Sequence, residues 1–144
     1  MPFDELLEEV DRLAESGVLA QPLVTQYGQS SYRMRHGEQF AGRPGLQDLI
    51  DRSSLVITHG GSTVIQLLLS NKPFVAFPNP RGAGDHQTAF LRQVSSVVNI
   101  SWSQSVCDLE GLYKNRLRMG ASLVDNNIPK ASVLIDEFVR MKLQ

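Results

Sequence analysis

The stretch Ser54-Leu55-Val56-Ile57-Thr58-His59-Gly60-Gly61-Ser62-Thr63 decides the fold. Its first five residues form an apolar, partly β-branched run, which is typical of a strand buried in a parallel sheet. The run leads directly into a glycine-rich turn, and residues 63–70 then have helical character. A buried strand, a turn and a helix in this order form the repeating unit of parallel α/β sheets.

The same alternation continues along the rest of the chain. The sequence predicts helices over residues 1–16, 46–52, 63–70, 85–95, 106–119 and 129–141, and strands over 22–26, 36–40, 54–58, 74–77 and 97–100. Short connections between alternating elements favour an α/β fold with a doubly wound, Rossmann-like, mostly parallel sheet and helices on both faces. No linker or composition break interrupts the pattern, so we expect a single domain over residues 1–144.

Composition and charge exclude several classes of protein. Fourteen Lys and Arg residues against fifteen Asp and Glu residues give a net charge of -1 without a basic run, so we expect no nucleic-acid partner. Cys107 is the only cysteine, which excludes an internal disulfide and suits a reducing, cytoplasmic location. The apolar runs are far shorter than the roughly 20 residues that span a bilayer.

The turn after the 54–58 strand carries the strongest local signal for a ligand. A helix that starts near Thr63 leaves backbone N–H groups unpaired and carries partial positive charge, both of which favour a phosphate. Gly60 and Gly61 allow close approach, and Ser62 or Thr63 offers a hydroxyl. A tight turn with Ser62 or Thr63 as an N-cap explains the residues equally well. The pattern is neither Gly-x-Gly-x-x-Gly nor a Walker loop, which disfavours NAD and ATP.

Two further polar segments follow predicted strands. Asp85-His86-Gln87 comes after a loop rich in glycine and proline, and the segment 26–32 places Tyr27 at the end of a strand. Loops at the carboxyl ends of parallel strands converge on one crevice, so these segments are candidates for a shared site. The alternatives are a helix cap at Asp85, a surface His86 and a core Tyr27. The histidines and carboxylates lack metal-ligand spacing, so no metal is expected.

In order and spacing, these segments resemble the C-terminal domain of family 28 glycosyltransferases. The residues that carry the resemblance are Gln26-Tyr27-Gly28 with Ser31-Tyr32, the stretch 51–62, Lys72-Pro73 and Asp85-His86-Gln87. The group includes the MurG-like N-acetylglucosaminyltransferase of peptidoglycan synthesis. This chain is more similar to the free-standing subunits of two-part transferases, which act in exopolysaccharide or capsule synthesis or on dolichol-linked sugar.

The resemblance implies the C-terminal half of a GT-B fold that binds a UDP-sugar and acts as a hexosyltransferase. The implied donor-binding residues are Tyr27, Gly28, Gly60, Gly61, Ser62, Thr63, Gln66, Asp85, His86 and Gln87. No metal or other cofactor is implied, because helix dipoles and backbone donors stabilise the leaving UDP in such enzymes. For a catalytic role, His59 is the best candidate that this chain itself offers.

Two departures from the family pattern qualify the expected site. Related enzymes carry a glutamate that accepts hydrogen bonds from the ribose, and Gln66 stands at that position without the charge. The usual first strand, which precedes the first helix, is also missing. We expect either that the natural start lies upstream of Met1 or that a neighbour satisfies the open sheet edge.

The leading hypothesis is a UDP-sugar-binding subunit of a two-component glycosyltransferase. A membrane-associated partner would supply the acceptor site for a lipid-linked or polysaccharide acceptor, so this chain would lie in the cytoplasm, peripheral to the membrane. Self-association through the open sheet edge is a further expectation. One alternative is a non-catalytic enhancer or scaffold subunit without donor binding of its own. Another is an α/β nucleotide-binding protein unrelated to sugars.

Overall fold

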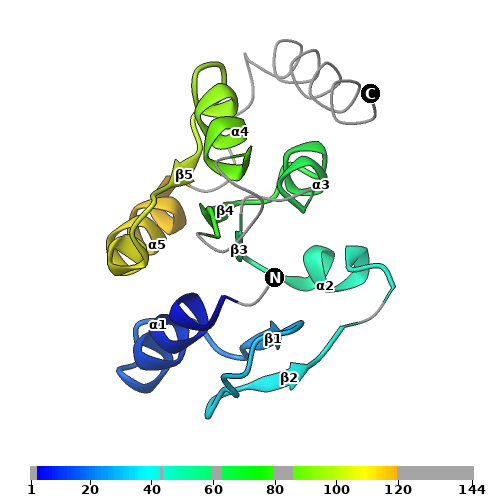
Figure 1. Cartoon of the computed structure of the whole chain (residues 1–144), viewed down its shortest axis with the longest axis vertical. Coiled ribbons are helices and arrows are strands. Elements are labelled where there is room, and N and C mark those ends of the chain that lie inside the picture. The colour runs from blue at the N-terminus through cyan, green and yellow to red at the C-terminus, as the bar shows by residue number, and fades with distance from the viewer. Residues whose placement is uncertain (1–2, 43, 60–62, 80–85, 120–144) are drawn as a thin grey trace.

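In the computed structural model, the described residues are 3–42, 44–59, 63–79 and 86–119. Strands and helices alternate along them (Figure 1). In chain order the elements are α1 (Asp4–Glu15), β1 (Val24–Gln26), β2 (Glu38–Phe40), α2 (Gln47–Arg52), β3 (Val56–His59), α3 (Thr63–Leu69), β4 (Phe74–Phe77), α4 (His86–Ser95), β5 (Ser101–Trp102), the 3₁₀ turn η1 (Val106–Asp108) and α5 (Leu109–Met119).

Every strand pairing in the described residues is parallel. A three-stranded sheet has the order β3-β4-β5, with Val56 opposite Phe74 and Val75 opposite Ser101. Helix α3 lies between β3 and β4 in the chain, and α4 lies between β4 and β5. Parallel neighbours need such crossover connections, because a short hairpin cannot join them. The predicted α/β fold with a parallel sheet is confirmed.

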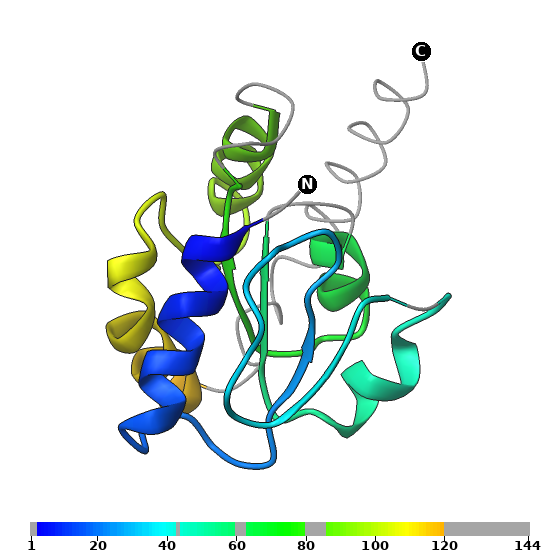
Figure 2. The ribbon, with the colours of Figure 1, turned by 60° about the horizontal axis from the view of Figure 1, so that its bottom comes forward.

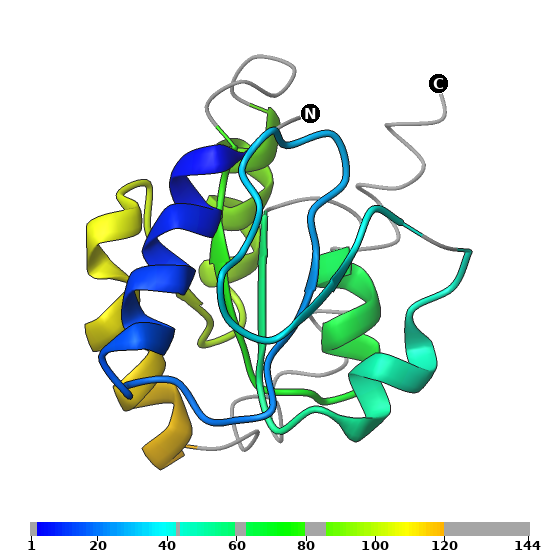
Figure 3. The ribbon, with the colours of Figure 1, turned by 90° about the horizontal axis from the view of Figure 1, so that it is seen from below.

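Strand β4 is the centre of the three-stranded sheet and all four of its residues are buried. Val75 and Phe77 contribute to a core with α1 and α5, whereas Phe74 and Ala76 contribute to a second core with α3 and α4. Alternate strand residues point to opposite faces, so each face of the sheet has its own helical layer. Figure 3 shows α1 and α5 side by side, with α2 and α3 on the other side of the strands. This is the predicted doubly wound arrangement.

Strands β1 and β2 form a separate parallel pair, with Thr25 opposite Gln39. No strand among the described residues joins this pair to the three-stranded sheet, and Figure 1 shows the two sets of strands apart. The first described element is α1, so the absence of the usual strand ahead of it stays a prediction. Figure 2 shows that β1 and β3 run in the same general direction.

The amphipathic pattern of the first helix explains its burial. Leu6, Leu7, Val10, Leu13 and Ala14 recur at helical spacing, and all five are buried. The helix stops before Gly17, whose φ of 82° lies in the left-handed region that glycine adopts at helix ends. The helix predicted at the start of the sequence is thus confirmed over Asp4–Glu15.

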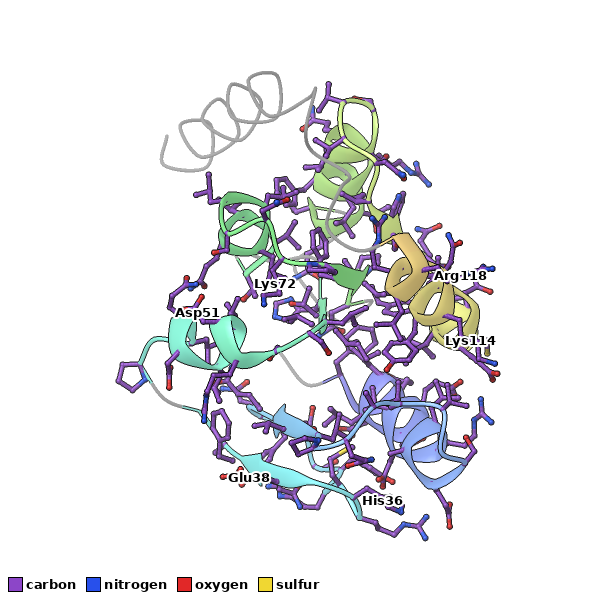
Figure 4. The ribbon with its side chains drawn as sticks, turned by 180° about the vertical axis from the view of Figure 1, so that it is seen from behind. His36, Glu38, Asp51, Lys72, Lys114 and Arg118 are labelled. Atoms are coloured by element: carbon purple, nitrogen blue, oxygen red, sulfur yellow. The ribbon has the colours of Figure 1, made fainter. Side chains whose placement is uncertain are left out.

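Carboxylates of α1 hold the loop that follows β1. Asp4 accepts hydrogen bonds from the backbone and hydroxyl of Ser31 (3.1 and 2.8 Å). The buried Asp11 accepts from the Tyr32 hydroxyl at 2.6 Å and contacts His36 Nδ1 at 2.7 Å. Figure 4 shows His36 beside α1. These contacts fix the loop at the carboxyl end of β1 against the helix.

Burial and hydrogen bonding act on Asp11 in opposite directions. Burial by itself raises the pKa of this carboxyl, but the hydrogen bonds from Tyr32, His36 and the Arg35 backbone together lower it below 3.8. Hydrogen bonds to the charged form stabilise it, so Asp11 is a carboxylate in the folded protein at neutral pH.

A buried arginine ties α5 to β5. Arg116 is 1% exposed, and its Nε donates to Ser101 Oγ at 2.8 Å while Nη2 donates to the Asn99 carbonyl at 3.3 Å. Desolvation lowers its pKa from the ordinary value. Its guanidinium thus fixes the edge strand of the sheet through two hydrogen bonds, although no sequence pattern indicated this role.

The predicted strand over residues 97–100 is wrong, because β5 lies at Ser101–Trp102 instead. The backbone N–H groups of Val97 and Val98 donate to the Val94 carbonyl, so this segment continues the turn at the end of α4. Val98 is apolar because it packs in the core with α4, and such a short apolar run does not distinguish a strand from a helix end. The predicted helix over 129–141 lies outside the described residues.

Replacing Asp11 with Ala should lower the free energy of unfolding by about 1–3 kcal/mol, because it leaves the loop donors without their acceptor. The folded-state pKa of Asp11 is lowered, so its contribution is present above about pH 4 and is lost as the pH falls through the folded value. Urea unfolding at pH 7 and pH 3 measures both effects.

The control is Glu8→Ala, which changes an exposed carboxylate on the same helix and should alter stability by less than about 0.5 kcal/mol. Equal effects of the two substitutions at pH 7 would show that the Asp11 contacts do not hold the loop.

Candidate functional site

The carboxyl end of β3 places His59 and the start of α3 beside one another along the chain. His59 is the last residue of the strand and is exposed, and Thr63 is the first residue of the helix. Gly60, Gly61 and Ser62 lie outside the described residues, so the predicted phosphate cradle stays a prediction. Helix α3 has only seven residues.

A hydrogen-bonded side chain, that of Gln87, connects the carboxyl end of β4 with His59 at the end of β3. The buried Asn79, two residues beyond the strand, donates its backbone N–H to Gln87 Oε1 at 2.7 Å. The other end of the Gln87 amide, Nε2, lies 3.2 Å from His59 Nδ1. The structure thereby brings together the end of β3, the end of β4 and the first turn of α4.

The environment of His59 holds its imidazole in the neutral form at pH 7. The residue as a whole is exposed, but neighbouring protein displaces water from the ring, and this desolvation lowers its pKa from 6.5. A neutral imidazole has one nitrogen that donates and one that accepts, and the hydrogen bonds of the ring decide which nitrogen does which.

Gln66 lies on α3 and its amide is engaged by α2. Gln66 Nε2 donates to Gln47 Oε1 at 2.8 Å, and Gln47 Nε2 donates to Asp51 Oδ1 at 2.7 Å. This chain of amides links the two helices, and Figure 4 shows Asp51 on α2. The contact with Gln47 holds the Gln66 amide nitrogen toward α2, so the Gln66 carbonyl oxygen points away from Gln47.

Tyr27 and Gly28 follow β1, on the other pair of strands. Tyr27 packs against the α1 core, and the Arg33 guanidinium lies 3.8 Å from the centroid of its ring. Gly28 has a φ of 58°, the left-handed conformation that suits glycine in the turn. No described hydrogen bond links these two residues to His59 or Gln87. One face of the Tyr27 ring is therefore occupied by Arg33, and a nucleotide base would have to use the other.

Of the two residues that precede Gln87 in the predicted site, the structure describes only one. His86 is exposed at the first position of α4, and Asp85 lies outside the described residues. Sequence reasoning missed Asn79, which contacts Gln87 through its backbone. Its position just after the buried β4 strand was the available signal, since residues there lie at the edge where ligands of open α/β sheets bind.

The sequence predicted neither a metal site nor a membrane-spanning segment, and the described residues can be searched for both. Within the ranges that the structure describes, no group of three or more His, Cys, Asp or Glu residues could hold a metal ion. No helix of those ranges is long and apolar enough to cross a membrane. A metal-free transferase therefore stays a prediction.

The fold and this edge define a Rossmann-like α/β domain with polar side chains gathered at the carboxyl ends of neighbouring parallel strands. The family model of the glycosyltransferase family 28 C-terminal domain matches residues 4–115. The chain belongs to this family and is a glycosyltransferase-type domain. Comparison with the curated proteins and with the solved structures finds no match.

The pKa of His59 in the folded chain should lie below 6.5, because desolvation penalises the imidazolium. An NMR titration of the ring resonances measures it, and the same residue in the urea-unfolded chain is the matched control. A folded-state pKa at or above the unfolded value would contradict the desolvation of the His59 ring.

Proposed function

We propose that the chain is the UDP-sugar-binding subunit of a hexosyltransferase that works with a separate acceptor-binding chain. The observation that carries this proposal is the contact of His59, Gln87 and the Asn79 backbone at the carboxyl edge of a family 28 domain. In open α/β sheets this edge is where nucleotide ligands bind. Backbone and hydroxyl groups of Gly60, Gly61, Ser62 and Thr63 would hold the donor diphosphate.

In the proposed reaction, an acceptor hydroxyl oxygen forms a bond to the anomeric carbon of the donor sugar. The bond from that carbon to the diphosphate oxygen breaks, and its electron pair leaves with UDP. The acceptor proton passes to a general base. Donors fixed before the reaction stabilise the charge that develops on UDP, so the chemistry requires no metal in this proposal.

Gln66 and Gln87 would face different parts of the donor: Gln66 the ribose, and Gln87, beside His59, the sugar or phosphate. The Gln66 carbonyl oxygen would accept from a ribose hydroxyl, while its amide nitrogen stays on Gln47. A neutral amide makes such a bond about half as strong as a carboxylate. Tyr27 and Gly28 would lie toward the base, and His86 near the entrance of the crevice.

The partner in this proposal is a membrane-associated chain that supplies the acceptor site. This would place the complex in the cytoplasm at the membrane surface, in polysaccharide or lipid-linked saccharide synthesis. A second candidate is an enhancer subunit that binds no donor. The neutral Gln66, with its amide engaged by α2, favours that candidate because the ribose loses its charged acceptor.

Calorimetric titration with UDP separates the two candidates. We expect UDP to bind the chain alone, or the complex that co-purifies with it, and Gln87→Ala to weaken binding roughly tenfold through the loss of one to two hydrogen bonds. Gln93→Ala is the matched control, because it changes an exposed glutamine near the other end of α4.

The control should bind UDP within about twofold of the natural chain, and far-UV circular dichroism checks that all variants fold. Absence of UDP binding in both the isolated chain and the complex would contradict donor binding and support the enhancer subunit.

A further inference from the structure

The contact between Gln87 and His59 has a direction that the backbone of Asn79 fixes. A backbone N–H can only donate, so the Gln87 atom 2.7 Å from Asn79 N must be the carbonyl oxygen. The two ends of the glutamine amide are thereby assigned from a donor that cannot be reversed. The end that faces His59 is the NH₂ group, which can only donate.

It follows that Nδ1 of His59 accepts a hydrogen bond and carries no proton. A neutral imidazole has its proton on one nitrogen, so the proton of His59 is on Nε2. Protonation of the ring would place an Nδ1–H group against the Gln87 NH₂ group, where two donors face each other. The desolvation that lowers the pKa of His59 acts in the same direction.

This assignment limits what His59 can do chemically. Nδ1 faces Gln87, so Nε2 is the ring nitrogen that this contact leaves for a ligand. Nε2 bears a hydrogen and has no free lone pair in the ring plane, so it donates and does not accept. In this state His59 does not act as a general base, although the sequence made it the best candidate in this chain for a catalytic role.

We infer that Gln87 is a positioning residue that keeps His59 as a neutral donor, and that His59 Nε2–H binds an anionic oxygen of the donor diphosphate. The inference rests on the proposed function for the identity of the ligand. The state of the His59 ring does not depend on it. With Nδ1 engaged by Gln87 and Nε2 already protonated, the ring offers the acceptor hydroxyl no free lone pair, so in this proposal another residue serves as the general base.

The ring nitrogens of His59 report the arrangement directly in a two-bond ¹H–¹⁵N NMR spectrum of the labelled chain. We expect Nε2 protonated and Nδ1 as a hydrogen-bonded acceptor at pH 7. Gln87→Glu should move a proton onto Nδ1, because a carboxylate that keeps the Asn79 contact offers only acceptors to the ring. Gln87→Leu should remove the Nδ1 hydrogen bond. The ring of His36, which contacts Asp11, is the internal control and should not change.

A proton on Nδ1 in the natural chain would overturn the inference, as would unchanged His59 signals in both Gln87 variants. A merely structural Gln87 would leave these signals in place.

UDP binding tests the assigned ligand. Addition of UDP should shift the His59 Nε2 signal. His59→Gln, which keeps a donor close to the Nε2 position, should bind UDP within about threefold of the natural chain, and His59→Leu should lose on the order of tenfold or more.

The outcomes of this test are distinguishable from those of the proposed function. UDP that binds without moving the His59 signals would overturn the His59 role and leave donor binding intact. Absence of UDP binding in both the isolated chain and the complex would overturn donor binding and the assigned ligand, while the ring signals of the free protein would still test the state of His59.

Discussion

The burial of β4 on both faces is the constraint on which the rest of the structure depends. Its four residues alternate between two cores, so α1 and α5 cover one face and α3 and α4 cover the other. β3 and β5 each pair with it in parallel. A strand buried in this way offers no room for polar side chains along its length, and the first polar group that it can present lies beyond its carboxyl end.

Asn79 is that group, and its position links the end of the buried strand to the candidate site. The backbone of Asn79 is held by the end of a rigid strand, and it orients Gln87, which in turn contacts His59 at the end of the neighbouring strand. The side-chain amide of Gln87 thus connects the ends of β3 and β4 with the first turn of α4. The Gln66 amide on α3 is fixed in a comparable way by Gln47 on α2.

Most of the fold could be predicted because strand and helix periods differ and the turns are marked by glycine and proline. The buried strand at residues 74–77 was found at its observed bounds, since its apolar run is closed by prolines. The strand predicted over residues 97–100 was wrong because a short apolar run at a helix end has the same pattern as a strand.

The site was harder to predict, since hydrogen bonds depend on distances that sequence spacing does not contain. His59 and Gln87 were named from their positions after strands, whereas the contact through the Asn79 backbone has no signature in side-chain chemistry. The buried Asp11 and Arg116 were missed for a similar reason, because each is a charged residue whose partners lie far along the chain. The phosphate loop and Asp85 remain predictions.

The most direct test of the central claim is a map of backbone amide shifts on addition of UDP to the ¹⁵N-labelled chain. If the carboxyl edge of the β3-β4-β5 sheet binds the donor, the largest changes will lie at His59, Thr63, Asn79 and Gln87. Changes concentrated instead around Asp11 and Arg35, or saturating UDP without changes at the four edge residues, would contradict it.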